Sequence, residues 1–342
     1  MNVHSLLAFL QGQAADLPAR KIADIFKPLA SPGESEKQVA MLTFAITGAI
    51  YVIVTSLLAY AIYRYRLRPG DNPREEPAQV YGSNQIEIAW TVIPILIVFV
   101  LTGVSARVIA AVENASPPKT TTHLTVIGHQ WWWEVYYPDY KVRTANEIHI
   151  PYSPDGGQAT YVQLESADVI HSFWIPQLSG KTDAIPNRNN YMWINPKASG
   201  VFYGNCAEYC GTQHANMLLR VVAQSPEDFK KWTLEQQKRV DTPSDRTAGQ
   251  NSVAANKAAF ESLACVNCHM IQGTTAVGKF GPDLTHLMSR QTIGGNMIEL
   301  THKNLRDWVN DPQTLKPGCL MPSLQLTDRE LDQVVAYLET LK

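Results

Sequence analysis

The chain has 342 residues, enough for two or three domains, and a formal net charge of −2 at pH 7. The near balance of acidic and basic residues argues against a nucleic-acid partner. Only 18% of the residues are charged, and the apolar residues gather in two long stretches.

These two stretches, residues 39–63 and 88–106, carry no charge, and only Pro94 interrupts the second. Each is long enough to cross a hydrocarbon core of roughly 30 Å. The short link between them is rich in arginine, which keeps such links in the cytoplasm. We therefore expect a transmembrane helical hairpin with both ends of the chain outside the cytoplasm. Two buried helices of a soluble protein would fit these runs poorly, and a weak apolar run at the start of the chain is compatible with a signal peptide.

A β-rich region follows the hairpin, from residue 122 to residue 224. Its short β-prone runs are separated by turn signals without a helical period, which predicts an antiparallel sandwich or barrel. The expected strands include 123–127, 131–137, 160–164, 169–175, 191–194, 201–203 and 217–223.

Helical signals dominate the remainder of the chain. Ser225 is the expected N-cap of a helix with Pro226 in its first turn. Polar residues 241–252 then predict a linker. The last unit is expected to be largely helical, and a capping box from Thr327 to Glu330 opens its final helix.

Four metal-ligand side chains follow one another in one short loop: Cys206, Cys210, His214 and Met217. Thiolate and thioether ligands select copper, above all Cu(I), and imidazole binds several transition metals. Because no hydrolytic site needs a methionine, this spacing indicates a copper site for electron transfer. The two cysteines alone would also permit a disulfide, half of a zinc site or two unrelated core residues, although zinc has no use for Met217.

A dinuclear copper site with these ligands would still lack one. His171, upstream on an expected strand, is the candidate. A single histidine on such a strand is more often an ordinary core residue, but the incomplete site favours the ligand role.

The segment Cys265-Val-Asn-Cys268-His269 is the C-x-x-C-H signature of covalent haem c attachment. A thioredoxin-like pair would need a βαβ context and a zinc knuckle a second pair, and the sequence around it has neither. Met321 is the predicted sixth ligand, because methionine opposite histidine raises the potential of a c-type haem. The competing ligands are His286, His302, Met270, Met288 and Met297.

Taken together, these motifs resemble subunit II of cytochrome c oxidase, which holds the dinuclear copper centre CuA. The remainder resembles a small cytochrome c, so the whole chain resembles the fused subunit II of a caa-type haem-copper oxidase. The matching segments of subunit II are 86–94, 128–133, 168–172, 181–186 and 206–217.

The resemblance implies a multidomain fold in which a two-helix hairpin precedes a cupredoxin-like antiparallel β-sandwich and an all-α class I cytochrome c domain. The implied divisions are an extracytoplasmic segment at 1–38, the hairpin at 39–112, the CuA domain at 113–240, the linker at 241–252 and the cytochrome c domain at 253–342.

The resemblance also implies the copper ligands. His171 and His214 would each bind one copper, and the thiolates of Cys206 and Cys210 would bridge the two. Met217 would be a weak axial ligand.

Three further residues take implied roles. Glu208 would offer its backbone carbonyl to the second copper and its carboxylate to a magnesium site at the interface with subunit I. Trp131 resembles the surface aromatic through which electrons enter, although Trp132 stands where the family usually has tyrosine. Glu87 resembles a carboxylate at the cytoplasmic mouth of a proton path, with an ordinary helix-end charge as the alternative. Cys319 has no implied role.

The implied function is electron transfer in a respiratory oxidase of the bacterial cytoplasmic membrane. Electrons from a cytochrome c or another donor would pass through haem c and CuA to haem in subunit I, where dioxygen is reduced to water with proton pumping. The implied partners are subunit I, further membrane subunits, the donor and lipid.

Two other functions remain open from the sequence. The chain could be the CuA subunit of a nitric oxide reductase, or a copper and haem redox sensor or copper-delivery protein without an oxidase partner. A flexible linker with a reach of roughly 20 Å leads to one more hypothesis, that the tether replaces electrostatic docking between the two redox domains.

Overall fold

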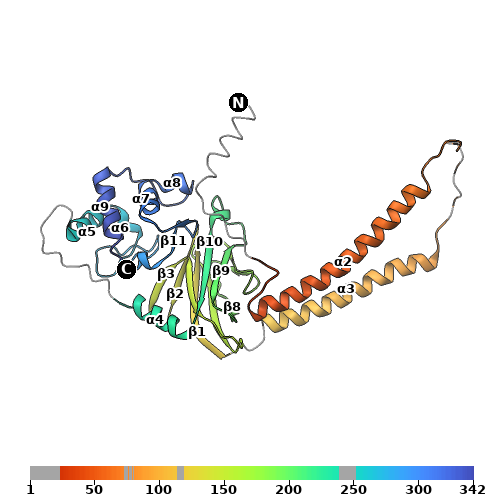
Figure 1. Cartoon of the computed structure of the whole chain (residues 1–342), viewed down its shortest axis with the longest axis horizontal. Helices are drawn as coiled ribbons and strands as arrows, with labels where there is room; N and C mark the ends of the chain where they lie inside the picture. The colour runs from red at the N-terminus through yellow and green to blue at the C-terminus, as the bar shows by residue number, and fades with distance from the viewer. Residues whose placement is uncertain (1–23, 73–75, 77–78, 80, 114–118, 239–251) are drawn as a thin grey trace. The chain divides into compact units, whose positions relative to one another are not determined.

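The computed structural model describes residues 24–72, 76, 79, 81–113, 119–238 and 252–342. The chain divides into two compact units (Figure 1), one covering residues 34–116 and the other combining the residues before 34 with those from 117 onward. The predicted linker at 241–252 lies outside the described residues, except for Ser252.

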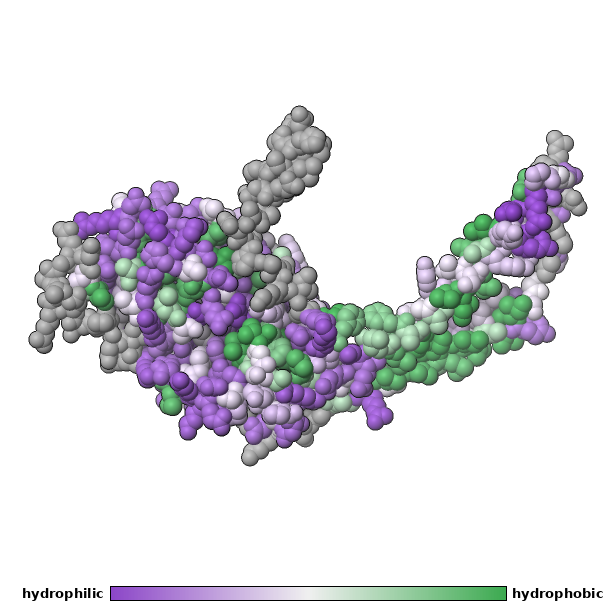
Figure 2. All heavy atoms as spheres, in the orientation of Figure 1, coloured by the Kyte–Doolittle hydropathy of each residue, from purple (hydrophilic) through white to green (hydrophobic). Residues whose placement is uncertain are grey.

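The hairpin consists of α2, Ser31–Arg64, and α3, Asn84–Glu113. Each helix contains one of the predicted apolar stretches, and no residue in the most apolar part of either helix is buried. Figure 2 shows hydrophobic side chains exposed along this hairpin. Exposed apolar surface of this extent is unfavourable in water, so it indicates a lipid environment. Pro94 lies inside α3, as transmembrane helices tolerate.

Residues just before the hairpin hydrogen-bond to the β-rich region. The Leu29 N–H donates to the Gln177 carbonyl (2.8 Å), and the Leu29 carbonyl accepts from the Lys197 N–H (2.9 Å). This part of the predicted segment 1–38 therefore lies on the same side of the membrane as the β-rich region. Residues 1–23, where the signal-peptide question falls, lie outside the described residues.

Two five-stranded sheets form a sandwich, which we call the β domain together with the helix that follows it (residues 119–236). The strand orders are β3-β2-β1-β5-β8 and β4-β10-β9-β6-β7. The strands are β1, Lys119–His129; β2, Trp132–Tyr137; β3, Val142–Ala145; β4, Glu147–Pro151; β5, Gln158–Ser166; β6, His171–Trp174; β7, Thr182–Ala184; β8, Asn190–Ile194; β9, Gly200–Cys206; and β10, Leu218–Gln224.

The core of the sandwich lies between the sheets because alternate residues of its strands point inward. In β2 every second residue is buried, and Trp133 and Tyr137 are fully so. The predicted sandwich is confirmed with one difference: β1 pairs with β5, and β4 with β10, in parallel. Parallel pairs join segments that lie far apart in sequence, so a local pattern does not reveal them.

The predicted helix after the sandwich is α4, Pro226–Gln236. The hydroxyl of its N-cap, Ser225, accepts from the Asp228 N–H (3.1 Å), as expected. Phe229 and Trp232 of α4 pack against Tyr137, so this helix covers one end of the sandwich core.

Residues 252–342 form the helical domain. Its elements are α5, Val253–Ser262; α6, Cys265–Cys268; the 3-10 helix η2, Leu287–Ser289; β11, Thr292–Ile293; β12, Ile298–Glu299; α7, His302–Asn310; α8, Pro312–Leu315; and α9, Asp328–Leu338. The capping box of Thr327 and Glu330 is present as predicted. The apolar stripe of α9 packs on α5, where the rings of Phe260 and Tyr337 lie 5.4 Å apart. The short β11–β12 pair and the isolated bridges of Met270 with Val277 and Asp283 depart from an all-helical pattern.

Candidate metal centres

The loop from Cys206 to Met217 joins two neighbouring antiparallel strands, β9 and β10. The Cys206 N–H donates to the Met217 carbonyl (3.0 Å), so the ladder of the strands closes the base of the loop. A closed base brings the first and last predicted ligands together without any help from distant segments. His171, the first residue of β6, is delivered from the same sheet, because β6 pairs with β9.

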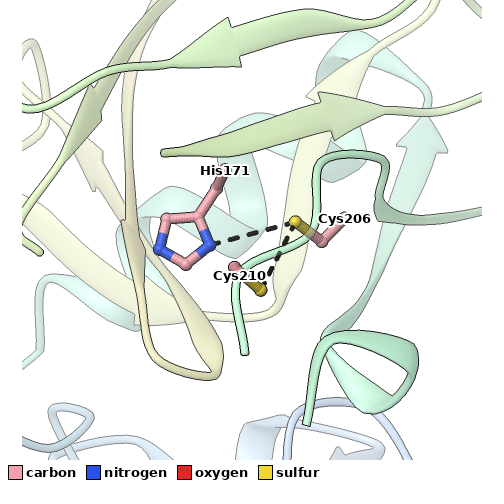
Figure 3. A group of neighbouring side chains, drawn as sticks. All are labelled: His171, Cys206 and Cys210. Atoms are coloured by element: carbon pink, nitrogen blue, oxygen red, sulfur yellow. Dashed lines mark hydrogen bonds between the residues drawn. The ribbon is translucent and has the colours of Figure 1, made fainter. Parts of the chain in front are cut away.

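The predicted copper ligands converge (Figure 3). The Cys206 Sγ lies 3.8 Å from the Cys210 Sγ and 3.9 Å from the His171 Nδ1. On the other side, the Cys210 Sγ lies 3.6 Å from the His214 Nδ1 and 3.8 Å from the Met217 Sδ. A disulfide requires sulfurs about 2.05 Å apart, so this arrangement is that of two separate thiols.

These donors fit metal ions held between them. With metal–sulfur bonds of roughly 2.3 Å and metal–nitrogen bonds of roughly 2.0 Å, donors that share a metal lie about 3–4 Å apart. Each sulfur has one imidazole beside it, and the Glu208 carbonyl lies 3.2 Å from the Cys206 Sγ. The set is thus two sulfurs in the middle, one histidine on each side, and a thioether and a carbonyl at the ends. This is the donor set that the resemblance implies for a dinuclear copper centre.

The two thiols influence each other's ionisation. The hydrogen bond with the Cys210 thiol lowers the pKa of Cys206, and the same contact together with burial raises the pKa of Cys210. Both sulfurs would have to be deprotonated to bind a metal, because thiolates are the ligands.

Asp168 lies beside the predicted ligand His171, and the sequence reasoning did not single it out. Its Oδ1 lies 2.8 Å from the Nε2 of His171, a fully buried ring. Burial opposes protonation of this ring, but the hydrogen bond to Asp168 raises the pKa of His171. A carboxylate on the outer nitrogen fixes the tautomer and leaves Nδ1 facing the sulfurs. The spacing Asp168-x-x-His171 was the available signal.

Gly128 leaves room for the same ring. A Cβ at this position would lie 2.6 Å from the His171 Cδ2, which is too close for any real contact. The ring can occupy its site only because residue 128 has no side chain.

Trp131 links the copper loop to a cavity in the helical domain. Its indole N–H donates to the Cys210 carbonyl (3.0 Å), and the Gln130 side chain donates to the same oxygen (2.7 Å). Trp131 was expected at the surface, but it is only 9% exposed. It is buried because it lines the cavity together with residues of the helical domain.

The cavity gathers the four predicted haem ligands. Cys265, Cys268, His269 and Met321 all line it. The His269 Nδ1 donates to the Pro282 carbonyl (2.8 Å), which leaves Nε2 free for an iron. Most of the other lining side chains are apolar, as a porphyrin requires.

The competing sixth ligands do not line this cavity in the described part of the chain. The His286 Nδ1 is bonded to the Lys342 carbonyl, and His302 is paired with Glu339. Met288 and Met297 pack against the helical core. Gln313 was not predicted to matter, yet its amide donates to the Met321 carbonyl (2.7 Å) and so holds the ligand loop.

Glu87 and Cys319 are the two residues of the sequence analysis that remain to be located. Glu87 is exposed in the first turn of α3, where a carboxylate also suits the helix dipole. Cys319 is half-buried, and its sulfur accepts from the Gln313 amide (3.3 Å) while it lines the haem cavity.

Models of known protein families match three parts of the chain. The family model "Cytochrome C oxidase subunit II, transmembrane domain" matches residues 20–108, "Cytochrome C oxidase subunit II, periplasmic domain" matches 144–225, and "Cytochrome c" matches 253–342.

Similar proteins carry the corresponding names. Cytochrome c oxidase subunit 2 of Alkalihalophilus pseudofirmus is 32% identical over 88% of this chain and 86% of its own. That of Bacillus sp. (strain PS3) is 33% identical over 81% of this chain and 80% of its own. The solved periplasmic domain of subunit II from Bradyrhizobium japonicum is 31% identical, covers 35% of this chain and 96% of its own, and gives a TM-score of 0.33.

Substitution of Asp168 by alanine should weaken copper binding. Losing the carboxylate frees the His171 ring to turn, and such outer partners are typically worth about 10–100-fold in metal affinity. Copper affinity is measured by competition with a chelator of known strength. Asp139→Ala is the matched control, because Asp139 pairs with the exposed His123 (3.1 Å) instead. Equal affinities in both variants would contradict the role of Asp168.

Substitution of Met321 by alanine should remove the sixth haem ligand. The visible spectrum should change to a high-spin form or to that of a new ligand, and the reduction potential should fall. Met288→Ala, at a partly buried core methionine, should leave the spectrum unchanged. If Met321→Ala also leaves it unchanged, another residue is the ligand.

Proposed function

Because this chain belongs to the cytochrome c oxidase subunit II family and carries a cytochrome c domain, we propose that it is the subunit through which electrons enter a respiratory haem-copper oxidase. The family is part of an oxidoreductase, and the chain is a membrane protein with periplasmic domains. In the proposal, electrons arrive at the helical domain, leave through the copper loop and reach haem in subunit I, where dioxygen is reduced and protons are pumped.

One observation carries the proposal: Trp131 lines the haem cavity while its N–H bonds to the carbonyl of a copper ligand, Cys210. The two metal centres would supply one-electron redox chemistry when bound. Gln130 donates to the same carbonyl and also lines the cavity, so these two neighbouring side chains lie between the cavity and the copper loop. In the proposal, Trp131 has the electron-entry role that the resemblance implies, and the attached domain is its donor.

The rest of the site limits the access of water to the copper ligands and holds them in place. His171, Cys206, Cys210 and Met217 are buried and His214 is half-buried, so water has little access to four of the five proposed side-chain ligands. Rigid strands hold them, and fixed ligands keep the geometry change on electron transfer small. A copper-delivery protein would need exposed, exchangeable ligands, so the burial favours a permanent redox centre.

The partners follow from the family and from two carboxylates. We assign the half-buried Glu208 to the face that meets subunit I, where its carboxylate would bind magnesium. We assign Glu87 to the cytoplasmic mouth of a proton path. The arginine-rich link places α3's first turn on the cytoplasmic side. The bacterial cytoplasmic membrane, further membrane subunits and a soluble donor such as a cytochrome c complete the proposal.

The acceptor chemistry is tested by purifying the chain from its native membrane with all bound subunits. We expect a haem-copper subunit to co-purify, and reduced cytochrome c to be oxidised with consumption of dioxygen. The copper centre should show a near-infrared band and a mixed-valence paramagnetic signal. Nitric oxide consumption without dioxygen consumption would overturn the oxidase assignment, and a single-copper signal would overturn the dinuclear one.

Haem-to-copper transfer should depend little on ionic strength. Both domains are on one chain, and contacts between buried groups are screened far less than exposed charges. Flash-induced transfer is measured from about 0.01 to 1 M salt, a range over which the Debye length falls from roughly 30 to 3 Å. A steep loss of rate would show that the two domains dock through exposed charges.

A further inference from the structure

The helical domain touches the β domain through polar contacts, two of which involve nearly inaccessible charged side chains, Lys316 and Glu147. The contacts come from residues 289–296 and 316–318 of the helical domain. Both segments flank the haem cavity. A flexible tether alone would not require such contacts.

Lys316 reaches from the helical domain into the β domain. It is only 3% exposed, and its ammonium donates to the carbonyls of Trp131 (2.8 Å), Asn216 (2.9 Å) and Gly294 (3.1 Å). Three carbonyls use all three of its N–H donors. The first two belong to the residue beside the haem cavity and to the neighbour of the copper ligand Met217. Burial lowers the pKa of Lys316 to about 8, so the side chain remains mostly charged at neutral pH.

Glu147 reaches in the opposite direction, from β4 into the helical domain. It is 2% exposed, and its Oε1 accepts from the N–H of Gln291 (2.9 Å), the N–H of Thr292 (2.9 Å) and the hydroxyl of Thr292 (2.8 Å). A single carboxylate oxygen thus binds the segment that leads into β11.

The surrounding contacts agree with a fixed register. The Leu218 N–H donates to the Gly295 carbonyl (3.2 Å), and the Arg220 Nε donates to the Asn296 Oδ1 (2.6 Å). Gly295 has a φ of +80°, and a Cβ there would lie 2.6 Å from the Lys316 Nζ. The backbone is therefore shaped around the ammonium.

We propose that Lys316 and Glu147 form a reciprocal clamp that holds the haem cavity of the helical domain against Trp131. The proposal rests on the proposed electron-transfer function, in which both are positioning residues. A buried charge with its bonded groups contributes little net stability, but removing either the charge or its bonded group is costly. The best-attested use of such buried charges is to select one register between the packed elements. The attached domain is then a docked donor, and the linker serves only to keep it near while it docks.

The test uses the full chain in its native complex with three variants. Lys316→Met removes the ammonium at nearly constant size. Glu147→Gln keeps the size and one acceptor oxygen, so it should have a weaker effect in the same direction. Lys303→Met is the control, because the Lys303 side chain is 80% exposed on α7 and pairs with Asp307 of the same helix.

Amide hydrogen exchange is measured at N–H groups that do not contact the substituted side chain. In Lys316→Met the reporters are the N–H groups of Gln291 and Thr292, which bond to Glu147; in Glu147→Gln the reporter is the N–H of Leu218. If the two charges act as one clamp, the reporters should exchange at least about tenfold faster in Lys316→Met, since 1.4 kcal/mol is a factor of ten. A smaller acceleration is expected in Glu147→Gln, and none in the control.

Flash-induced haem-to-copper transfer is the second readout. It should slow in Lys316→Met and become dependent on solvent viscosity, while the spectra of both centres stay unchanged. Unchanged exchange at the distant reporters, or an unchanged transfer rate, would overturn the clamp. If Lys316→Met does not fold, Glu147→Gln decides the question by the same readouts. Absence of transfer in the unsubstituted chain would instead overturn the proposed function, and the exchange data would still judge the clamp.

Discussion

The hydrogen bond from the Cys206 N–H to the Met217 carbonyl is the constraint on which the copper site depends. It closes the loop between β9 and β10 at its base, so the four loop ligands cannot spread apart. The loop then points its sulfurs toward His171, which β6 supplies from the same sheet. The hydrogen bonds between β9 and β10 therefore hold the ligand loop in shape, so metal binding needs to order little of the backbone.

The carbonyl of Cys210 extends this constraint beyond the loop. It accepts from both Gln130 and Trp131. Asp168 accepts from the Gln130 N–H (2.7 Å) and also holds His171. The ligand histidine and the tryptophan beside the haem cavity are thus parts of one hydrogen-bonded group. Displacing either one should disturb the other, which matters for a site whose use is transfer between two fixed points.

The interface between the two redox domains changes the view of the linker. A tether raises the local concentration of its two ends to roughly the millimolar range, which is enough for repeated encounters. Lys316 and Glu147 go further, because buried charges that each make three hydrogen bonds tolerate few alternative arrangements. The hairpin differs from this interface, because lipid and not protein covers its apolar side chains.

The sequence alone determined what is local. The four loop ligands, the C-x-x-C-H motif, the two apolar stretches and the caps at Ser225 and Thr327 each depend on neighbours within a few residues, so their spacing reports their geometry. His171 could be inferred because the loop was one ligand short. Tertiary structure alone decided the parallel strand pairs, the partnership of Asp168 with His171, the burial of Trp131 and the contacts of Lys316. These depend on which distant segments meet: Lys316 and Trp131 are 185 residues apart, and nothing in the pattern around either residue encodes the other.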